Sequence, residues 1–260
     1  MEKKSYHRGR RQKKQKKHSI ITTVILVIAL VVFAVSAFQL VRIFKGYQDG
    51  ENEYRELADL AVTEEDDRFR VDFDALWEIN PDVVAWIRFD EPAVINYPMV
   101  QGDDNEEYLH KTFQGYDNTV GTIFVNVGNN PDFNDRNTIV YGHYMYNGTM
   151  FNDLEKYKDE EFYRQYPYFY IYTPDGAEIT YQIYSAGEVK DTSESYTYQF
   201  ADDASFEHFI ETTKAAGWYD TGGTPGVNDQ IVTLSTCTRQ SNDNRTVIHA
   251  VKVNVDYPEE

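Results

Sequence analysis

The sequence predicts a mainly β domain, a barrel or a sandwich with helical insertions, behind a single N-terminal transmembrane helix. A long uncharged apolar run follows a basic tail at the N-terminus. From Val83 onward, segments rich in β-branched and aromatic residues alternate with clusters of Gly, Pro, Asn and Asp that favour turns. Many short strands with few helices are typical of barrels and sandwiches, and about 190 residues are enough for one hydrophobic core.

The first 41 residues are typical of a membrane anchor. Residues 1–18 form a tail with nine Lys or Arg and one Glu, and residues 19–41 hold 23 residues without a charge. Such a helix crosses a hydrocarbon core of about 30 Å. Small residues before Phe38 would suit a cleaved signal peptide, but the apolar run exceeds the ~7–15 residues usual there, so we expect an uncleaved anchor. The basic flank predicts a cytoplasmic tail and an extracellular domain.

The distribution of charge excludes one class of partner. The formal net charge of the chain is −18, of which the tail contributes +8 and residues 42–50 contribute +1, so residues 51–260 carry −27. Binding to nucleic acid requires Lys and Arg against the phosphates, so we expect no nucleic acid partner.

Two helical segments are expected before the strands. Residues 42–70 are charged and helix-permissive, and they predict a juxtamembrane helical segment that either spaces the following domain from the bilayer or packs on it. A short helix should follow, with Asp72 or Asp74 as its N-cap, and should end near Pro81. We expect residues 71–260 to form the remaining domain.

Seven segments predict strands, and two interruptions predict helices. The β-branched and aromatic composition indicates strands over residues 83–89, 121–127, 137–143, 168–173, 178–189, 231–237 and 245–255. Pro174, Asp175 and Gly176 predict a hairpin turn between two of them. Helices are expected over residues 149–167 and 202–219. In the second, four residues form one apolar face, namely Phe206, Phe209, Ile210 and Thr213.

The single cysteine, Cys237, ends a predicted strand. It has no partner for an internal disulfide, so the remaining possibilities are a free thiol, an intermolecular bridge and an inert buried residue. A nucleophilic thiolate needs a base or cation nearby. His143 lies at a strand end and is the candidate base. Three other histidines are better explained as structural or surface residues, namely His110, His208 and His249.

The segment after Cys237 predicts a hairpin. Polar residues follow the thiol and an alternating strand begins at Arg245, so antiparallel pairing would place Arg245 opposite Cys237. A guanidinium there is suited to hold an oxyanion. Arg239, two residues after the thiol, is the competing candidate, and either arginine by itself is also compatible with a solvated surface charge.

Several motifs in one order resemble the sortases, which are membrane-anchored cysteine transpeptidases of Gram-positive bacteria, and class B in particular. The resemblance covers residues 72–255. It is carried by "INPDVVAWI" (79–87), "INYPMVQGDDNEEYL" (95–109), "GTIFVN" (121–126), "IVYGHYMYNGTMFNDLEKY" (139–157), "TLSTC" (233–237) and a long helical insertion before the cysteine strand.

The resemblance implies a fold and a set of site residues. The fold would be an eight-stranded barrel with N-terminal helices. Cys237 would be the nucleophile, His143 the acid and base, and Arg245 the anchor of the oxyanion and the substrate. Four further residues would bind substrate, namely Ser235, Thr236, Asn105 and Leu109.

The same resemblance implies an activity at the outer face of the membrane. The thiol would cleave a sorting signal of the NPxTN or xPxTG kind after Thr, and an amine of a peptidoglycan precursor or a pilin would resolve the thioester. The partners would be surface proteins that carry the signal, and no cofactor or metal is expected. An L,D-transpeptidase is an alternative, although Thr236 precedes the cysteine where those enzymes have glycine. A non-enzymatic adhesion or sensor ectodomain is the other.

Overall fold

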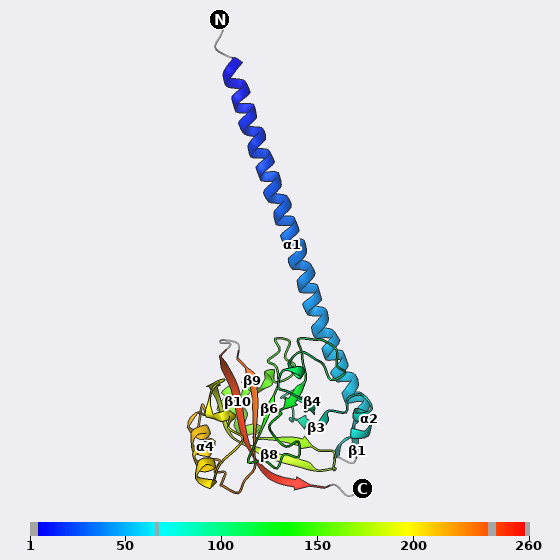
Figure 1. The fold of residues 1–260 in the computed structure, drawn as a ribbon, viewed down its shortest axis with the longest axis vertical. Coiled ribbons are helices and arrows are strands. Elements are labelled where there is room, and N and C mark those ends of the chain that lie inside the picture. The colour runs from blue at the N-terminus through cyan, green and yellow to red at the C-terminus, as the bar shows by residue number, and fades with distance from the viewer. Residues whose placement is uncertain (1–4, 66–67, 239–242, 258–260) are drawn as a thin grey trace. The chain divides into compact units, whose positions relative to one another are not determined.

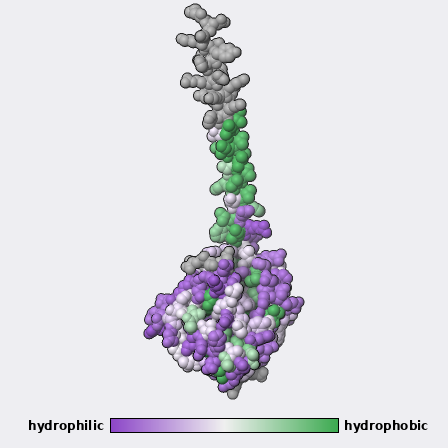
Figure 2. All heavy atoms as spheres, turned by 60° about the vertical axis from the view of Figure 1, so that its left-hand side comes forward, coloured by the Kyte–Doolittle hydropathy of each residue, from purple (hydrophilic) through white to green (hydrophobic). Residues whose placement is uncertain are grey.

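The computed structural model describes residues 5–65, 68–238 and 243–257 and divides the chain into two compact units, residues 1–48 and 49–260. The first unit is helical and belongs to α1 (Ser5–Ala61). Among the described residues, Ile20–Ala61 is the only helix long and apolar enough to cross a membrane. Figure 2 shows apolar side chains around its span and a mostly hydrophilic face on the second unit.

The second unit is built on a closed barrel of eight strands, in the order β10-β8-β7-β3-β4-β5-β6-β9 (Figure 1). Neighbouring strands are antiparallel except β4 with β5 and β6 with β9. The strands are β3 (Val83–Arg88), β4 (Asn96–Val100), β5 (Ile123–Val125), β6 (Asn137–Tyr141), β7 (Tyr168–Tyr172), β8 (Glu178–Lys190), β9 (Ile231–Cys237) and β10 (Asn244–Asp256).

Among the eight strands of the barrel, β4 is the one that the sequence does not predict. Its Pro98 lacks an N–H, and proline inside a run argues against a strand. Pro98 is tolerated because its backbone pairs only with Trp86 of β3, whereas the ladder to β5 begins at Met99. The missing N–H of Pro98 therefore falls at a position where β4 is not paired with β5.

The end of α1 differs from the prediction. We expected helix over residues 42–70, but α1 ends at Ala61, and β1 (Val62–Glu65) pairs with β2 (Arg68–Val71) as a separate two-stranded sheet. The β-branched pair Val62 and Thr63 favours strand at the point where the helix stops. The short helix α2 (Phe73–Trp77) follows, and Asp72 is its N-cap, since its carboxylate accepts from the Ala75 N–H at 3.0 Å.

The last turns of α1 pack on the barrel. Leu57 and Ala61 are each 1% exposed. The hydroxyl of Tyr54, also buried, donates to the carbonyl of Gly121 at 2.5 Å. Of the two roles expected for the juxtamembrane segment, this part of it therefore packs on the barrel.

Helical insertions lie outside the barrel. The expected helix over residues 149–167 is split at Asp159 into η2 (Asn152–Lys158) and α3 (Glu160–Gln165). Between β8 and β9 lie η3 (Glu194–Tyr196) and α4 (Asp203–Ala215). The predicted apolar face of α4 is confirmed, since Phe206, Phe209, Ile210 and Thr213 are its buried residues. The short 3-10 turn η1 (Glu107–Leu109) precedes β5.

Beneath α4 lies a fully buried histidine, His249. Its Nδ1 is 2.9 Å from Thr233 Oγ1. Because the single Thr233 hydroxyl proton is donated to Asn137 Oδ1, the histidine must donate from Nδ1, and its buried Nε2 has no partner in the described part of the chain. Burial lowers the pKa of His249 to about 3. This explains the strand-face histidine as a core residue.

We predict that His249 makes the domain less stable in acid. The unfolded chain binds the proton near pH 6.5 and the folded chain only near pH 3, so stability is lost as pH falls through this window. The contribution is about 1.4 kcal/mol per pH unit. Urea unfolding of the His249→Leu variant at pH 7, 5.5 and 4.5 should show a correspondingly smaller loss. The Thr233→Val variant keeps the histidine and should keep the wild-type slope; equal slopes in all three proteins would contradict the prediction.

Candidate active site

Three adjacent strands bring the predicted catalytic side chains to one end of the barrel. Arg245 of β10 pairs directly with Cys237 of β9, as the predicted hairpin requires. On the other side of β9, Tyr141 of β6 pairs in parallel with Ser235. His143 and Cys237 each lie two residues beyond that pair, and the Gly142 N–H still donates to the Ser235 carbonyl at 3.1 Å. The end of β9 that carries Cys237 therefore lies between the end of β6, which His143 follows, and the start of β10, which carries Arg245.

The orientation of His143 is set by two backbone contacts. Its Nε2 lies 2.7 Å from the Leu109 carbonyl oxygen, an acceptor, so Nε2 carries the proton and Nδ1 is the basic nitrogen. Gly121, with φ +62°, lies beneath the ring, and a Cβ there would come within 2.8 Å of Cδ2 of His143. Burial lowers the pKa of His143, and the nearby His110 lowers it further. The hydrogen bond to the Leu109 carbonyl opposes this shift but does not cancel it. The imidazole is therefore mainly neutral at pH 7.

Arg245 is only partly exposed, with 24% of its side chain accessible. Its Nη1 donates to the Asn244 carbonyl at 3.0 Å, and its Nη2 lies 3.9 Å from Oδ2 of Asp191. The Asp191 N–H in turn donates to the Asp243 carbonyl, which ties the end of β8 to the start of β10. Arg239 lies outside the described residues.

The two residues before the thiol lie on opposite faces of β9. Ser235 shares the face of Cys237, and its Oγ is 2.8 Å from the Tyr196 hydroxyl. Thr236 lines the same cavity, yet its side chain belongs to the barrel-interior face. Its hydroxyl is buried and has no partner among the described residues.

One cavity of about 430 Å³ collects all seven residues that the sequence singles out. Cys237 itself is exposed, so a substrate has access to the thiol. Leu109, at the end of η1, and Asn105, just before it, belong to the wall of this cavity. The cavity is lined by Asn105, Leu109, Phe124, Tyr141, Gly142, His143, Asp191, Tyr196, Ser235, Thr236, Cys237 and Arg245.

Sequence reasoning did not assign a role to five of these residues, namely Phe124, Tyr141, Gly142, Asp191 and Tyr196. The Tyr196 ring stacks on Tyr141 with centroids 6.3 Å apart and planes 13° apart, and Phe124 contacts Tyr141 at 5.2 Å. Burial raises the pKa of Tyr196, while Arg245 opposes this and Asp191 adds to it. Tyr196 lies in the segment between β8 and α4, where the sequence has no helical or strand periodicity. Its place between a strand and a helix was therefore the only hint that it could reach the site.

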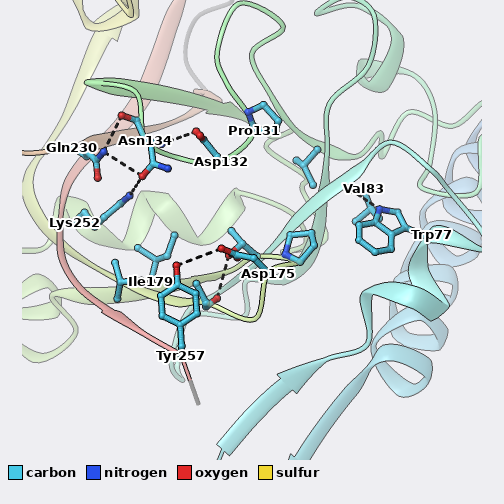
Figure 3. A pocket seen from close by; sticks show the side chains of 15 residues that line it. Trp77, Val83, Pro131, Asp132, Asn134, Asp175, Ile179, Gln230, Lys252 and Tyr257 are labelled. Atoms are coloured by element: carbon cyan, nitrogen blue, oxygen red, sulfur yellow. Dashed lines mark hydrogen bonds between the residues drawn. The ribbon is translucent and has the colours of Figure 1, made fainter. Parts of the chain in front are cut away.

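A larger cavity, about 530 Å³, lies at the opposite end of the barrel (Figure 3). There Asp175 faces Tyr257, and Lys252 donates to the Phe133 carbonyl at 2.6 Å and to Asn134. This cavity has neither a thiol nor an imidazole in its wall. The residue chemistry, and not the volume, therefore makes the cavity of Cys237 the candidate active site.

The remaining histidines lie elsewhere. His110 is exposed, and His208 is exposed with its Nε2 3.4 Å from Glu194. His249 is enclosed beneath α4. Among the described histidines of the barrel unit, His143 alone lines the cavity of Cys237.

Comparison with known proteins identifies the family of this chain. A family model described as the Sortase domain matches residues 90–253. Sortase B of Listeria monocytogenes is 32% identical over 181 residues, which cover 69% of this chain and 72% of that protein. Sortase B of Staphylococcus aureus is 27% identical over 211 residues, which cover 80% and 86%.

Solved structures agree with the sequence matches. Sortase B of B. anthracis, in complex with AAEK1, superposes with a TM-score of 0.71 at 32% identity and covers 82% of this chain and 100% of its own. A Staphylococcus aureus sortase B-substrate complex gives a TM-score of 0.65 at 30% identity, with 70% and 84% covered. These findings decide against both the L,D-transpeptidase and the non-enzymatic ectodomain. The chain belongs to the sortase family, and within it to class B.

Proposed function

We propose that Cys237, His143 and Arg245 are the catalytic residues with which this sortase cleaves a sorting signal after Thr. Sortases of class B are cysteine transpeptidases that anchor surface proteins, and this chain is an enzyme of that kind. The observation that carries the assignment is the register of three strands. In this register, β6, which His143 follows, pairs with one side of β9, and β10, which carries Arg245, pairs with the other. The exposed Cys237 ends the strand between them.

The first half of the reaction acylates the enzyme. The neutral His143 accepts the thiol proton, and the Cys237 sulfur attacks the carbonyl carbon of the Thr in the sorting signal. The guanidinium of Arg245 donates hydrogen bonds to the oxyanion that forms. His143 then gives its proton to the departing amine as the C–N bond breaks, which leaves a thioester between the Thr carbonyl and Cys237.

The second half transfers the surface protein. An amine attacks the thioester carbonyl, and His143 accepts a proton from this amine. The C–S bond then breaks, and His143 returns the proton to the Cys237 sulfur. The acceptor is an amine of a peptidoglycan precursor or a pilin. We propose NPxTN or xPxTG as the signal, bound between Asn105 and Leu109 on one wall and Ser235 and Thr236 on the other, because these residues line the cavity of the thiol.

The proposed location follows from the charge asymmetry around the anchor. The helix from Ile20 is apolar enough to span a membrane, and the basic tail precedes it. Basic flanks stay in the cytoplasm, so the tail lies inside and the barrel lies outside, where surface proteins and wall precursors meet.

The proposed activity is tested by peptide cleavage. The Cys237→Ala variant should reduce cleavage of fluorogenic NPxTN and LPxTG peptides to the uncatalysed background, because the nucleophile is lost. Its thermal unfolding midpoint should match that of the wild type, since the thiol is exposed at a strand end. Residual turnover at more than about one hundredth of the wild-type rate would contradict the assignment of the nucleophile.

We also predict which arginine acts. The Arg245→Ala variant should lower kcat by about 100- to 1,000-fold, as loss of an oxyanion donor does. The Arg239→Ala variant should lose less. Steady-state cleavage of the same peptides measures both variants, and equal or reversed losses would show that the arginine assignment is wrong.

The proposed topology is tested with the single native thiol. A membrane-impermeant maleimide should label Cys237 in intact cells that express the wild-type chain. A variant that carries Ser5→Cys together with Cys237→Ala should be labelled only after the cells are permeabilised. Labelling of the tail thiol in intact cells would show the opposite orientation.

A further inference from the structure

A chain of amide hydrogen bonds leads from the wall of the catalytic cavity into the interior of the domain. Asn105, at the cavity, donates from Nδ2 to Oδ1 of Asn126 at 2.7 Å. Asn126 donates to Oδ1 of Asn129 at 3.3 Å. These last two side chains are 4% and 6% exposed, so each buried amide needs protein partners.

The orientation of each amide in this chain is determined by groups of known polarity. Asn129 donates from Nδ2 to the Asp135 carboxylate and to the Asn137 carbonyl, both at 2.8 Å, and neither can donate in return. Its Oδ1 must therefore face the Ile139 N–H at 3.0 Å and Nδ2 of Asn126.

The same logic fixes the next two amides. Because Asn126 points its Nδ2 at Asn129, its Oδ1 points at Asn105 and accepts from it. Asn105 then turns its own Oδ1 to the Val127 N–H at 2.9 Å. An amide has two N–H donors, so Asn105 retains one N–H beyond its bond to Asn126.

The peptide backbone of Asn126 is also held. Its N–H donates to the Ile139 carbonyl at 2.9 Å, and its carbonyl accepts from Nε2 of Gln101 at 3.0 Å and from the Asn129 N–H at 2.9 Å. Asn126 is thus rigid at both backbone and side chain, which is what a residue needs in order to fix a neighbour.

We propose that Asn126 is a positioning residue for substrate binding, which fixes the Asn105 amide so that its remaining N–H is presented to a carbonyl oxygen of the sorting peptide. This inference rests on the proposed role of Asn105. Without Asn126, the Asn105 amide keeps only the hydrogen bond from the Val127 N–H. One hydrogen bond holds its orientation less firmly than two, so in part of the population the remaining N–H would no longer face the peptide carbonyl.

A double-mutant cycle on the full-length chain in detergent micelles tests the proposal. With a fluorogenic NPxTN or LPxTG peptide, Asn105→Ala and Asn126→Ala should each lower kcat/KM by about five- to tenfold, mainly through KM, as loss of one hydrogen bond does. The double variant should lose no more than Asn105→Ala alone, because Asn126 acts through Asn105.

The Ser185→Ala variant is the control for lost stability. It removes a buried hydrogen bond, from Ser185 Oγ to the Thr213 carbonyl at 2.7 Å, away from the cavity, and should leave kcat/KM unchanged. A double variant whose loss equals the product of the single losses would overturn the proposal. An Asn105→Ala variant with the kcat/KM of the wild type would also overturn the proposal, but the proposed catalytic function would stand. Cleavage of neither peptide by the wild-type chain would overturn the proposed function itself and this inference with it.

Discussion

The parallel pairing of β6 with β9 is the constraint on which the site depends. Parallel strands end at the same edge of a sheet, so the residues that follow them in the chain are neighbours. With Tyr141 paired to Ser235, the residues two positions further along, His143 just after β6 and Cys237 at the end of β9, lie at the same end of the barrel. The antiparallel hairpin to β10 then adds Arg245 on the other side of the thiol.

His143 and Cys237 differ in their exposure to solvent, and this difference suits each to its proposed role. The imidazole of His143 is half-buried against Gly121 and the Leu109 carbonyl, and desolvation favours its neutral form. The hydroxyl of Tyr54, near the end of α1, donates to the Gly121 carbonyl, so the last turns of α1 also support the position of His143. The thiol remains open to a peptide. A neutral base beside an accessible nucleophile is the arrangement that acyl transfer needs.

Local patterns predicted much of this molecule, and long-range pairing explains what they missed. The span near the N-terminus, the buried face of α4 and the pairing of Cys237 with Arg245 all follow from periodicity or from one hairpin. The strand β4 was hidden by Pro98, whose missing donor matters only once the register is known. Tyr196 and Asn126 reach the site through contacts between separate loops, and hydrogen bonds among amides have no period in a sequence.

The central claim is that a thioester forms on the one cysteine of this chain. Intact-mass analysis after acid quench measures it directly, with the full-length chain mixed with a cleavable sorting peptide and no amine acceptor. We expect a mass increase equal to the acyl fragment that ends at Thr, located on Cys237 and removed by hydroxylamine. Cleavage of the peptide without an adduct on Cys237 would contradict the account.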